Sequence, residues 1–560
     1  MFNMNDWLPK SVLTLRHYTK RQFLADSIAG VTVGLVALPL AMAFAIASGM
    51  SPQSGIYCAV IAGFLISALG GSSTQIGGPT GAFVVVVFGI VARYGVDGLY
   101  MCTLLAGAIL VILGITGLGT TVKYIPRPVV VGFTNGIAVI IASTQIKDFF
   151  GLKVDKVPGE FLGRIETLAR NFHTISFQET GLACLALLII IVFAKYFKRI
   201  PGYIIALLVG TSLVWILKLP VETIGTRFGG IPSGMPSLHI PQFHFDMIRP
   251  LFAPAMTVAM LGAIESLMSA VVSDRMSGDK HNPNVELIAQ GVANIFSPLF
   301  GGLPATGAIA RTATNIRSGA RTPVAGMIHA LTLLAILLFA APLASFIPLS
   351  VLSAILFVVA YNMGEWREIP ELLKLSPLEI GTWLVTFALT VFADLTVAVE
   401  AGMILAALVF IRKVTATTKV SRVTSEYIEY GRAHSLQDKI IPPYVTVFRI
   451  HGPFLFGAAD KLDNVLLQLS TLPPVIILRL RNMTAIDATG LQALENFADQ
   501  IRNSGRGLIL CGAPEQPSRL MQQSEFEEHV GRENICKNVA EALARAGELY
   551  KEISSAHVEV

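Results

Sequence analysis

Apolar runs fill residues 27–413 of this chain, and several, such as residues 181–196 and 322–341, approach or reach the ~20 residues that a helix needs to cross a bilayer. Charged residues make up only 14% of the 560 residues, against about 25% in soluble domains. Residues 414–560 lack such runs and have an ordinary soluble composition. The sequence therefore predicts an α-helical polytopic membrane protein with a soluble tail.

Charged or Gly/Pro-rich joints divide the apolar region into about fourteen segments, seven in residues 27–219 and seven in residues 252–413. Because each half has an odd number of spans, the second half enters the membrane upside down relative to the first. The third and tenth segments, residues 79–94 and 306–318, are too short to cross alone. We therefore expect a 7+7 inverted repeat over residues 27–413.

Lysine and arginine side chains indicate the orientation, because they concentrate in cytoplasmic loops. If residues 1–26 form a cytoplasmic segment, an even number of spans returns the tail to the cytoplasm as a linker (414–441) and a soluble domain (442–560). The inner loops then hold Lys123, Arg127, Lys195, Lys198, Arg199, Arg275, Lys280, Arg317, Arg321, Arg367 and Lys374.

Glycine and proline interrupt the apolar sequence at two corresponding places, residues 77–83 (GGPTGAF) and 301–308 (GGLPATGA). Backbone groups freed from a helix cannot face lipid, so such a break lines a protein-enclosed cavity. Paired breaks in two halves indicate the substrate site of a secondary transporter. The alternative interpretation is that both breaks are kinks in continuous helices.

Two half-helices that meet near the middle of the membrane form an anion site, because their N-termini carry unpaired N–H groups and partial positive charge. Arg311 lies one turn into the second broken helix, where a charge costs at least ~2.5 kcal/mol on insertion scales. It either attracts the anion, pairs with a carboxylate or reaches the inner membrane face. The predicted substrate-binding residues around the breaks are Thr80, Gly81, Ala82, Phe83, Thr306, Gly307, Ala308, Ile309, Ala310 and Arg311.

Glu265 lies in the middle of the eighth segment, residues 252–272, and Ser269 follows one turn later on the same face. A carboxylate inside a membrane is a functional-site candidate. Three roles stay open for Glu265: proton carrier, sodium ligand or ion-pair partner of Arg311. We predict Glu265 and Ser269 as the coupling residues, H⁺ or alternatively Na⁺ as the coupling ion, and no other cofactor or metal.

The soluble tail alternates short strands with helices, which is typical of a small α/β layer domain. Either Asp487 or Thr489 is expected to cap the helix that starts there. The expected strands are residues 444–450, 475–480 and 507–511, and the expected helices are residues 458–469 and 489–503.

Several motifs resemble the sulfate permease (SulP, solute carrier 26) anion transporters, which end in a STAS domain, and the resemblance covers essentially the whole chain. They are residues 38–45 (LPLAMAFA), 77–80 (GGPT), 265–267 (ESL), and 301–304 (GGLP) with Arg311 and Thr312.

The resemblance implies fourteen spans in a core and a gate domain, a homodimer, elevator-like movement, and the aromatic Phe44 near the substrate. Leu40 stands where relatives carry glutamine, and glutamate at position 265 resembles the proton-coupled members. Residues 261–267 and 308–311 are similar to the bacterial C4-dicarboxylate uptake member. Residues 487–490 (DATG) resemble the phosphorylated loop of anti-sigma-factor antagonists, which makes Thr489 a regulatory candidate.

These observations predict a secondary active transporter of the bacterial inner (cell) membrane, multi-pass with both termini cytoplasmic, that takes up a C4-dicarboxylate or sulfate with protons. Expected partners are the small anion, the lipid bilayer, a second copy and regulatory proteins at the STAS domain, but no nucleic acid. The alternatives are a bicarbonate or other inorganic anion symporter or exchanger, an uncoupled channel, and a membrane anion sensor. An enzyme is not expected, because the sequence has no phosphate-binding Gly-Lys loop and its histidines and cysteines lack ligand spacing.

Overall fold

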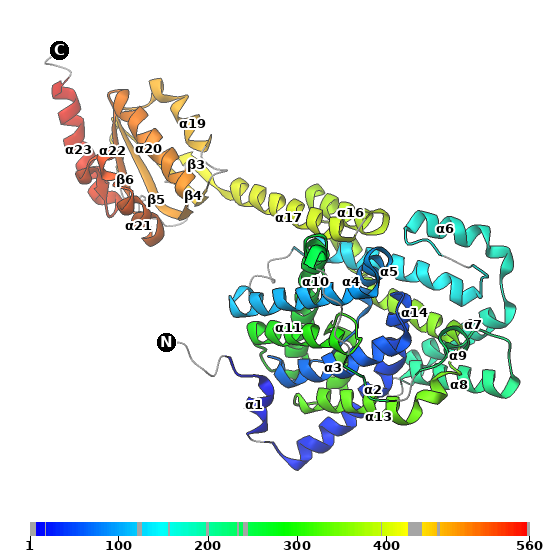
Figure 1. Ribbon diagram of the computed structural model, residues 1–560. Coiled ribbons are helices and arrows are strands. Elements are labelled where there is room, and N and C mark those ends of the chain that lie inside the picture. The colour runs from blue at the N-terminus through cyan, green and yellow to red at the C-terminus, as the bar shows by residue number, and fades with distance from the viewer. Residues whose placement is uncertain are drawn as a thin grey trace. The chain divides into compact units, whose positions relative to one another are not determined.

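The computed structural model describes residues 7–16, 18–119, 126–154, 157–197, 201–231, 234–238, 245–393, 395–423, 440–455 and 460–556. The chain divides into two compact units, Met1–Ala406 and Ala407–Val560 (Figure 1). The first unit is almost entirely helical, and the second is built on a β-sheet. This agrees with the predicted order of a helical membrane region and an α/β domain.

Long apolar helices make up the first unit. Among the described residues, seven helices are long and apolar enough to cross a membrane (α2, α3, α4, α5, α7, α10 and α13), and α8, α14 and α16 are shorter apolar helices. Their bounds, with those of the other main helices, are α2 (Lys20–Ala47), α3 (Pro52–Leu69), α4 (Gly81–Ile115), α5 (Arg127–Phe150), α7 (Phe177–Tyr196), α8 (Gly202–Leu217), α10 (Ile248–Ser277), α11 (Pro283–Leu299), α12 (Ile309–Arg317), α13 (Val324–Ala344), α14 (Leu349–Met363), α16 (Pro377–Phe392) and α17 (Leu395–Thr417).

Each expected apolar segment overlaps one of these helices, with one difference. The expected segments 79–94 and 98–118 both lie in α4, which bends at Gly95 (φ +73°). The bend occupies a single residue, so helical geometry resumes at once and no loop separates the two parts. Short helices α1 (Lys10–Leu15), α6 (Phe161–Arg170), α9 (Ile224–Phe228) and α15 (Ile369–Leu372) lie outside the apolar runs.

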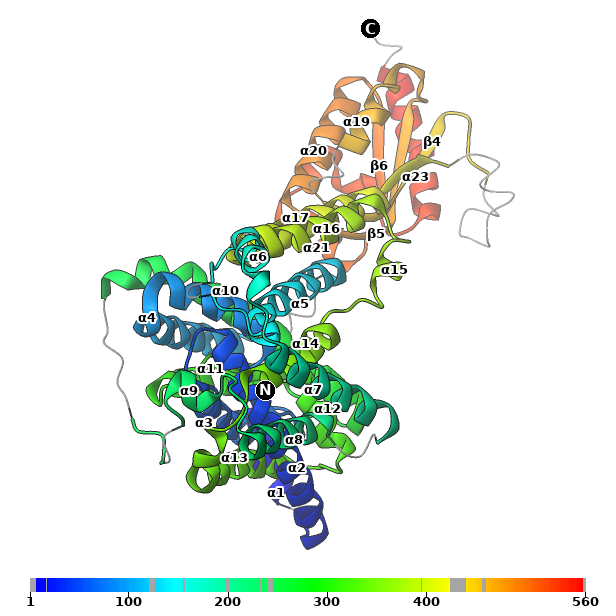
Figure 2. The same cartoon turned by 90° about the vertical axis from the view of Figure 1, so that its right-hand side faces the viewer.

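The helices of the first unit pack in two groups (Figures 1 and 2). Helices α2, α3, α4, α10, α11, α12 and α13 contact one another and are called the core group here; α5, α7, α8, α14 and α16 form the gate group. Helix α2 also packs against α14, across the boundary between the groups. This division corresponds to the core and gate domains that the family resemblance implies.

Gly55 sets how closely α3 approaches α2 in the core group. A Cβ atom at Gly55 would lie 1.9 Å from the carbonyl oxygen of Ala41, and a backbone atom cannot move aside cheaply. We expect Gly55→Ala to destabilise the folded chain by ~1–3 kcal/mol, seen as a lower thermal unfolding temperature in detergent. Gly381→Ala in α16, where a Cβ meets no atom within 4 Å, is the matched control and should leave that temperature unchanged. Equal unfolding temperatures for Gly55→Ala and the wild type would contradict the close approach.

Two short strands join the halves of the first unit. β1 (Gly77–Gly78) and β2 (Thr306–Gly307) pair antiparallel, with Gly77 opposite Gly307 and Gly78 opposite Thr306. Gly78 has a φ of +145°, in the region that favours glycine. Helix α4 begins just after β1, and α12 begins just after β2. The third and tenth segments are therefore interrupted, as predicted, and are not kinked continuous helices.

The second unit is a five-stranded sheet in the order β3-β4-β5-β6-β7. Strand β3 is antiparallel to β4, and the other neighbours are parallel. Helices α19, α20 and α21 cover one face of the sheet, and α23 covers the other (Figure 2). The elements are β3 (Lys419–Arg422), β4 (Val445–Phe454), α19 (Asp460–Leu466), β5 (Val475–Ile486), α20 (Ala488–Asn503), β6 (Gly507–Cys511), α21 (Glu515–Gln523), α22 (Glu527–Val530), β7 (Ile535–Cys536) and α23 (Val539–Ala556).

Every strand and helix expected in the tail overlaps an observed one, but the expected linker 414–441 needs correction. Helix α17 continues to Thr417, and β3 then pairs with β4, so the sheet begins before residue 442. The remainder of that linker, residues 424–439, lies outside the described residues. The sequence of β3, KVSR, does not predict a strand, because one valine among four residues forms no alternating apolar pattern.

Candidate functional site

The N-terminal ends of α4 and α12 line one cavity of about 400 Å³ in the first unit. The residues that precede the two helices are Thr80 and Ala308, and no described side chain caps either helix. Uncapped helix N-termini present free N–H groups and partial positive charge. A volume of this size falls within the ~300–1,000 Å³ typical of small-molecule sites. The two broken segments therefore direct positive potential into the same space.

Arg311 brings a full positive charge to this cavity. Its side chain is only 3% exposed, its Nη2 donates to the Pro79 carbonyl, and its Nη1 has no hydrogen-bond partner among the described residues. A Cβ atom at Gly78 would lie 2.9 Å from Nη1, so glycine at that position leaves room for the guanidinium. Burying an N–H donor of a cation without a hydrogen-bond partner costs free energy. This indicates that an anion completes the site by accepting from Nη1.

Glu265 on α10 faces the same cavity. The Thr80 hydroxyl donates to Glu265 Oε2 at 2.8 Å, which ties the carboxylate to the start of α4. Among the described residues, Glu265 and Arg311 form no ion pair, because Arg311 is directed to Pro79 instead. Neither the interpretation of the two as an ion pair nor that of Arg311 as a side chain at the membrane face agrees with this geometry.

Most of the predicted binding residues gather around the cavity, and four do not. Ala82 and Phe83 are buried in packing behind it. Thr306 donates to the Gly262 carbonyl at 2.9 Å, and the hydroxyls of Ser269 and Thr312 are 3.1 Å apart. The first contact holds α10 against β2 and the second holds it against α12, so Thr306 and Ser269 position the site without lining it. The predicted residues that line the cavity are Phe44, Thr80, Gly81, Glu265, Gly307, Ala308, Ile309, Ala310 and Arg311.

The gate group supplies a wall of the cavity that the sequence analysis did not anticipate. On the opposite side, the core group contributes Leu40, the residue that stands where relatives carry glutamine. The gate residues are Val129, Val130, Phe133, Thr134, Tyr203, Val359, Asn362 and Met363, with Glu365 just beyond α14. Most are apolar side chains inside apolar runs and carry no sequence signal; Glu365, a carboxylate that closely follows such a run, is the one that could have been singled out.

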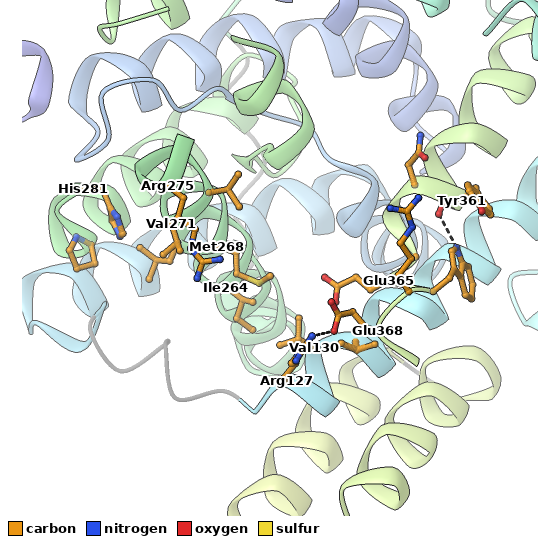
Figure 3. Close-up of a pocket in the computed structure, with 18 of the residues that line it drawn as sticks. Arg127, Val130, Ile264, Met268, Val271, Arg275, His281, Tyr361, Glu365 and Glu368 are labelled. Carbon is orange, nitrogen blue, oxygen red and sulfur yellow. Dashed lines mark hydrogen bonds and ion pairs between the residues drawn. The ribbon is translucent and has the colours of Figure 1, made fainter. Parts of the chain in front are cut away.

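A wider space adjoins the cavity, and we call it the vestibule (Figure 3). It has a volume of about 1,290 Å³ and shares Val130, Ile264, Met268, Asn362 and Glu365 with the cavity, so the two spaces lie on either side of the same residues. Figure 3 shows Arg275 and His281 on the α10 side and Tyr361 and Glu365 opposite them. The charged residues that line the vestibule are Arg127, Arg275, His281, Glu365, Arg367 and Glu368.

The regulatory candidate Thr489 lies at the start of α20, where it is exposed. The Asp487 carboxylate, and not Thr489, caps the helix, because it accepts from the Gly490 amide at 2.7 Å. The role of Thr489 in regulation stays a prediction.

Removing this cap should loosen the first turn of α20. We expect Asp487→Ala to destabilise the helix by ~1 kcal/mol, and hydrogen exchange at the Gly490 amide of the full chain should speed up about five-fold or more. Thr489→Ala is the matched control and should leave that exchange unchanged. Equal acceleration by both substitutions would contradict the assignment of the cap.

Comparison with known proteins gives consistent matches over most of the chain. Residues 23–386 match the Sulfate permease family, and residues 437–542 match the STAS domain. The chain is 40% identical to the "Putative sulfate transporter YvdB" of Bacillus subtilis (strain 168), over 92% of this chain and 97% of that protein. It is 30% identical to the bicarbonate transporter BicA of Picosynechococcus sp., over 94% and 95%.

Solved structures agree with these sequence matches. The structure of SLC26A9 superposes with a TM-score of 0.86, covering 97% of this chain and 93% of that chain at 18% identity, which shows the shared fold. The transmembrane domain of a cyanobacterial BicA matches with a TM-score of 0.60 at 33% identity, covering 70% of this chain and 98% of that chain.

Proposed function

This chain belongs to the sulfate permease family of multi-pass membrane anion transporters, and from that premise we propose that it takes up a small divalent oxyanion together with protons. The observation that carries this proposal is the cavity where two uncapped helix N-termini meet the unpaired Nη1 of Arg311. Together these groups offer a desolvated anion the hydrogen bonds and positive charge that it loses on leaving water.

The lining of the cavity favours a C4-dicarboxylate as the substrate. Leu40, Phe44, Phe133, Ile264 and Met363 give the cavity extensive apolar surface. The methylene groups of a C4-dicarboxylate can pack on that surface while a carboxylate occupies the Arg311 site. Sulfate is the second candidate, because a relative that is 40% identical carries the name of a sulfate transporter.

Glu265 is the proposed proton carrier. It shares the cavity with Arg311, and among the described residues its carboxylate accepts one hydrogen bond, from Thr80, which leaves capacity for a proton. A negative carboxylate beside an anion is unfavourable, so protonation of Glu265 favours occupancy of the site. Bicarbonate transport is the alternative that the similarity to BicA favours. Sodium is the alternative coupling ion at Glu265.

Alternating access would follow from movement of the core group past the gate group, since residues of both groups line the cavity. The vestibule lies beside basic loops, and by the positive-inside rule we take it as the cytoplasmic opening. We further propose that the chain works as a homodimer in the bacterial inner membrane, with cytoplasmic termini and a STAS domain that binds regulatory proteins.

An uptake panel tests the proposal. The full chain is reconstituted in proteoliposomes, and uptake of labelled succinate, sulfate and bicarbonate is measured with and without a pH gradient and with and without sodium. Saturable, gradient-driven uptake of succinate or sulfate is expected. Sodium-driven bicarbonate uptake would favour the alternative, currents without saturation would favour a channel, and binding without flux would favour a sensor.

A further inference from the structure

Glu365 occupies the junction between the cavity and the vestibule. It lies in the short stretch between α14 and α15, is half-buried, and lines both spaces. Figure 3 shows its side chain beside Glu368 and Arg127, at the edge of the vestibule. Because Glu365 lines both spaces, we place it on the route of an anion between the Arg311 site and the vestibule.

The neighbouring charges leave the Glu365 carboxylate without a direct partner. Among the described residues it accepts no hydrogen bond and forms no ion pair. Arg127 acts on it electrostatically, but the guanidinium of Arg127 pairs directly with Glu368. The other charged groups around the two spaces are Arg275 and His281 on the α10 side, Arg367 on the same stretch, and Glu265 and Arg311 in the cavity.

An unpaired carboxylate at the mouth of an anion site opposes the anion. Like charges repel, and the repulsion is stronger in a partly desolvated mouth than in water. The repulsion also grows in proportion to the charge of the anion, so it is twice as large in energy for a divalent anion as for a monovalent one. Arg127 cannot cancel it fully, because that side chain is already paired with Glu368.

We propose that Glu365 is a charge filter that weakens anion binding from the vestibule side, so that a substrate delivered there leaves and does not readily return. This inference rests on the proposed function, in which the vestibule is the cytoplasmic opening of an alternating-access carrier. The filter acts more strongly on divalent anions than on monovalent ones, which makes Glu365 a specificity-determining residue.

The test compares the two faces of the transporter. Right-side-out and inside-out membrane vesicles are prepared from cells that express the full chain, and KM for labelled succinate, sulfate and bicarbonate is measured from each face. Glu365→Gln should lower KM in inside-out vesicles by about five-fold for monovalent bicarbonate and by about the square of that factor for the divalent anions, as expected for one partly screened charge. KM in right-side-out vesicles should not change.

Two control variants separate the filter from a general change of charge. Glu365→Asp keeps the charge, and Glu371→Gln removes an exposed charge on α15 outside both spaces. Glu371→Gln should retain the wild-type KM from each face, and Glu365→Asp should lack the charge-dependent fall in KM that Glu365→Gln shows in inside-out vesicles. If Glu365→Gln does not insert, Glu365→Ser removes the same charge and replaces it in the comparison.

The remaining outcomes separate a failure of the charge filter from a failure of the proposed function. An unchanged KM in inside-out vesicles, or an equal fall from both faces, would overturn the filter while leaving anion transport in place. A wild-type chain that carries none of the three anions from either face would instead overturn the proposed function, and the filter with it.

Discussion

Replacing Arg311 with alanine is expected to weaken anion binding by about ten- to a hundred-fold. In this variant the anion loses a charge-assisted hydrogen bond from the guanidinium, an interaction of ~1.5–3 kcal/mol. Of the groups that attract the anion, only the two helix N-termini remain. The measurement is the dissociation constant of the transported anion by titration calorimetry on the purified chain, together with KM in proteoliposomes.

Two further variants define what Arg311 contributes. Arg311→Lys retains the charge but loses the planar fork, so its affinity should fall between those of the wild type and the alanine variant. Arg317→Ala removes an exposed arginine from the same helix and should bind as the wild type does. Unchanged affinity in Arg311→Ala would show that the anion does not contact this guanidinium.

Replacing Glu265 with glutamine is expected to remove the stimulation of uptake by a pH gradient. Glutamine fills the same space and can still accept from Thr80, but it cannot take up or release a proton. Gradient-driven uptake should fall to the rate seen without a gradient, while exchange of labelled for unlabelled substrate at equal pH continues. Both rates are measured in the same proteoliposomes.

The conservative variant Glu265→Asp keeps a carboxyl group and should retain some stimulation by the gradient. A loss of exchange together with gradient-driven uptake in Glu265→Gln would indicate a structural role instead. Undiminished gradient-driven uptake would exclude Glu265 as the proton carrier.

The sequence predicted the centre of the candidate site because the residues there are helix-breaking or charged, although the surrounding segments are apolar and helical. Glycine and proline in residues 77–83 and 301–308 cannot continue a membrane helix, and Arg311 and Glu265 carry charge where lipid would exclude it. Each exception to the apolar pattern requires an enclosed cavity, and the structure places them around one.

The gate wall could not be predicted for the opposite reason. Val129, Phe133 and Val359 obey the apolar pattern, so side chains that line the cavity look the same as side chains that face lipid or pack against a neighbouring helix. The strand β3 was missed because its four residues, of which only Val420 is apolar, are too few to carry a periodic signal. A residue can be recognised from the sequence only when its polarity or backbone preference differs from that of its neighbours, and these residues do not differ.

The orientation of side chains in the site also depends on hydrogen bonds to residues far away in the sequence. The sequence predicted Thr306 as a binding residue and Ser269 as a coupling residue, yet their hydroxyls are used in contacts to Gly262 and Thr312. These contacts join α10 to β2 and to α12, and no local sequence pattern specifies such long-range partners.

The pairing of β1 with β2 has a consequence for how the protein is made. When the ribosome has released only the first half, the extended residues around Gly77 are already in the bilayer, while the strand that satisfies their backbone groups is still more than 200 residues away. The nascent first half must therefore be shielded by the insertion machinery or remain incompletely threaded until residues 306–307 emerge. Synthesis of either half alone should yield a product that quality-control proteases remove, and simultaneous production of both halves should rescue it.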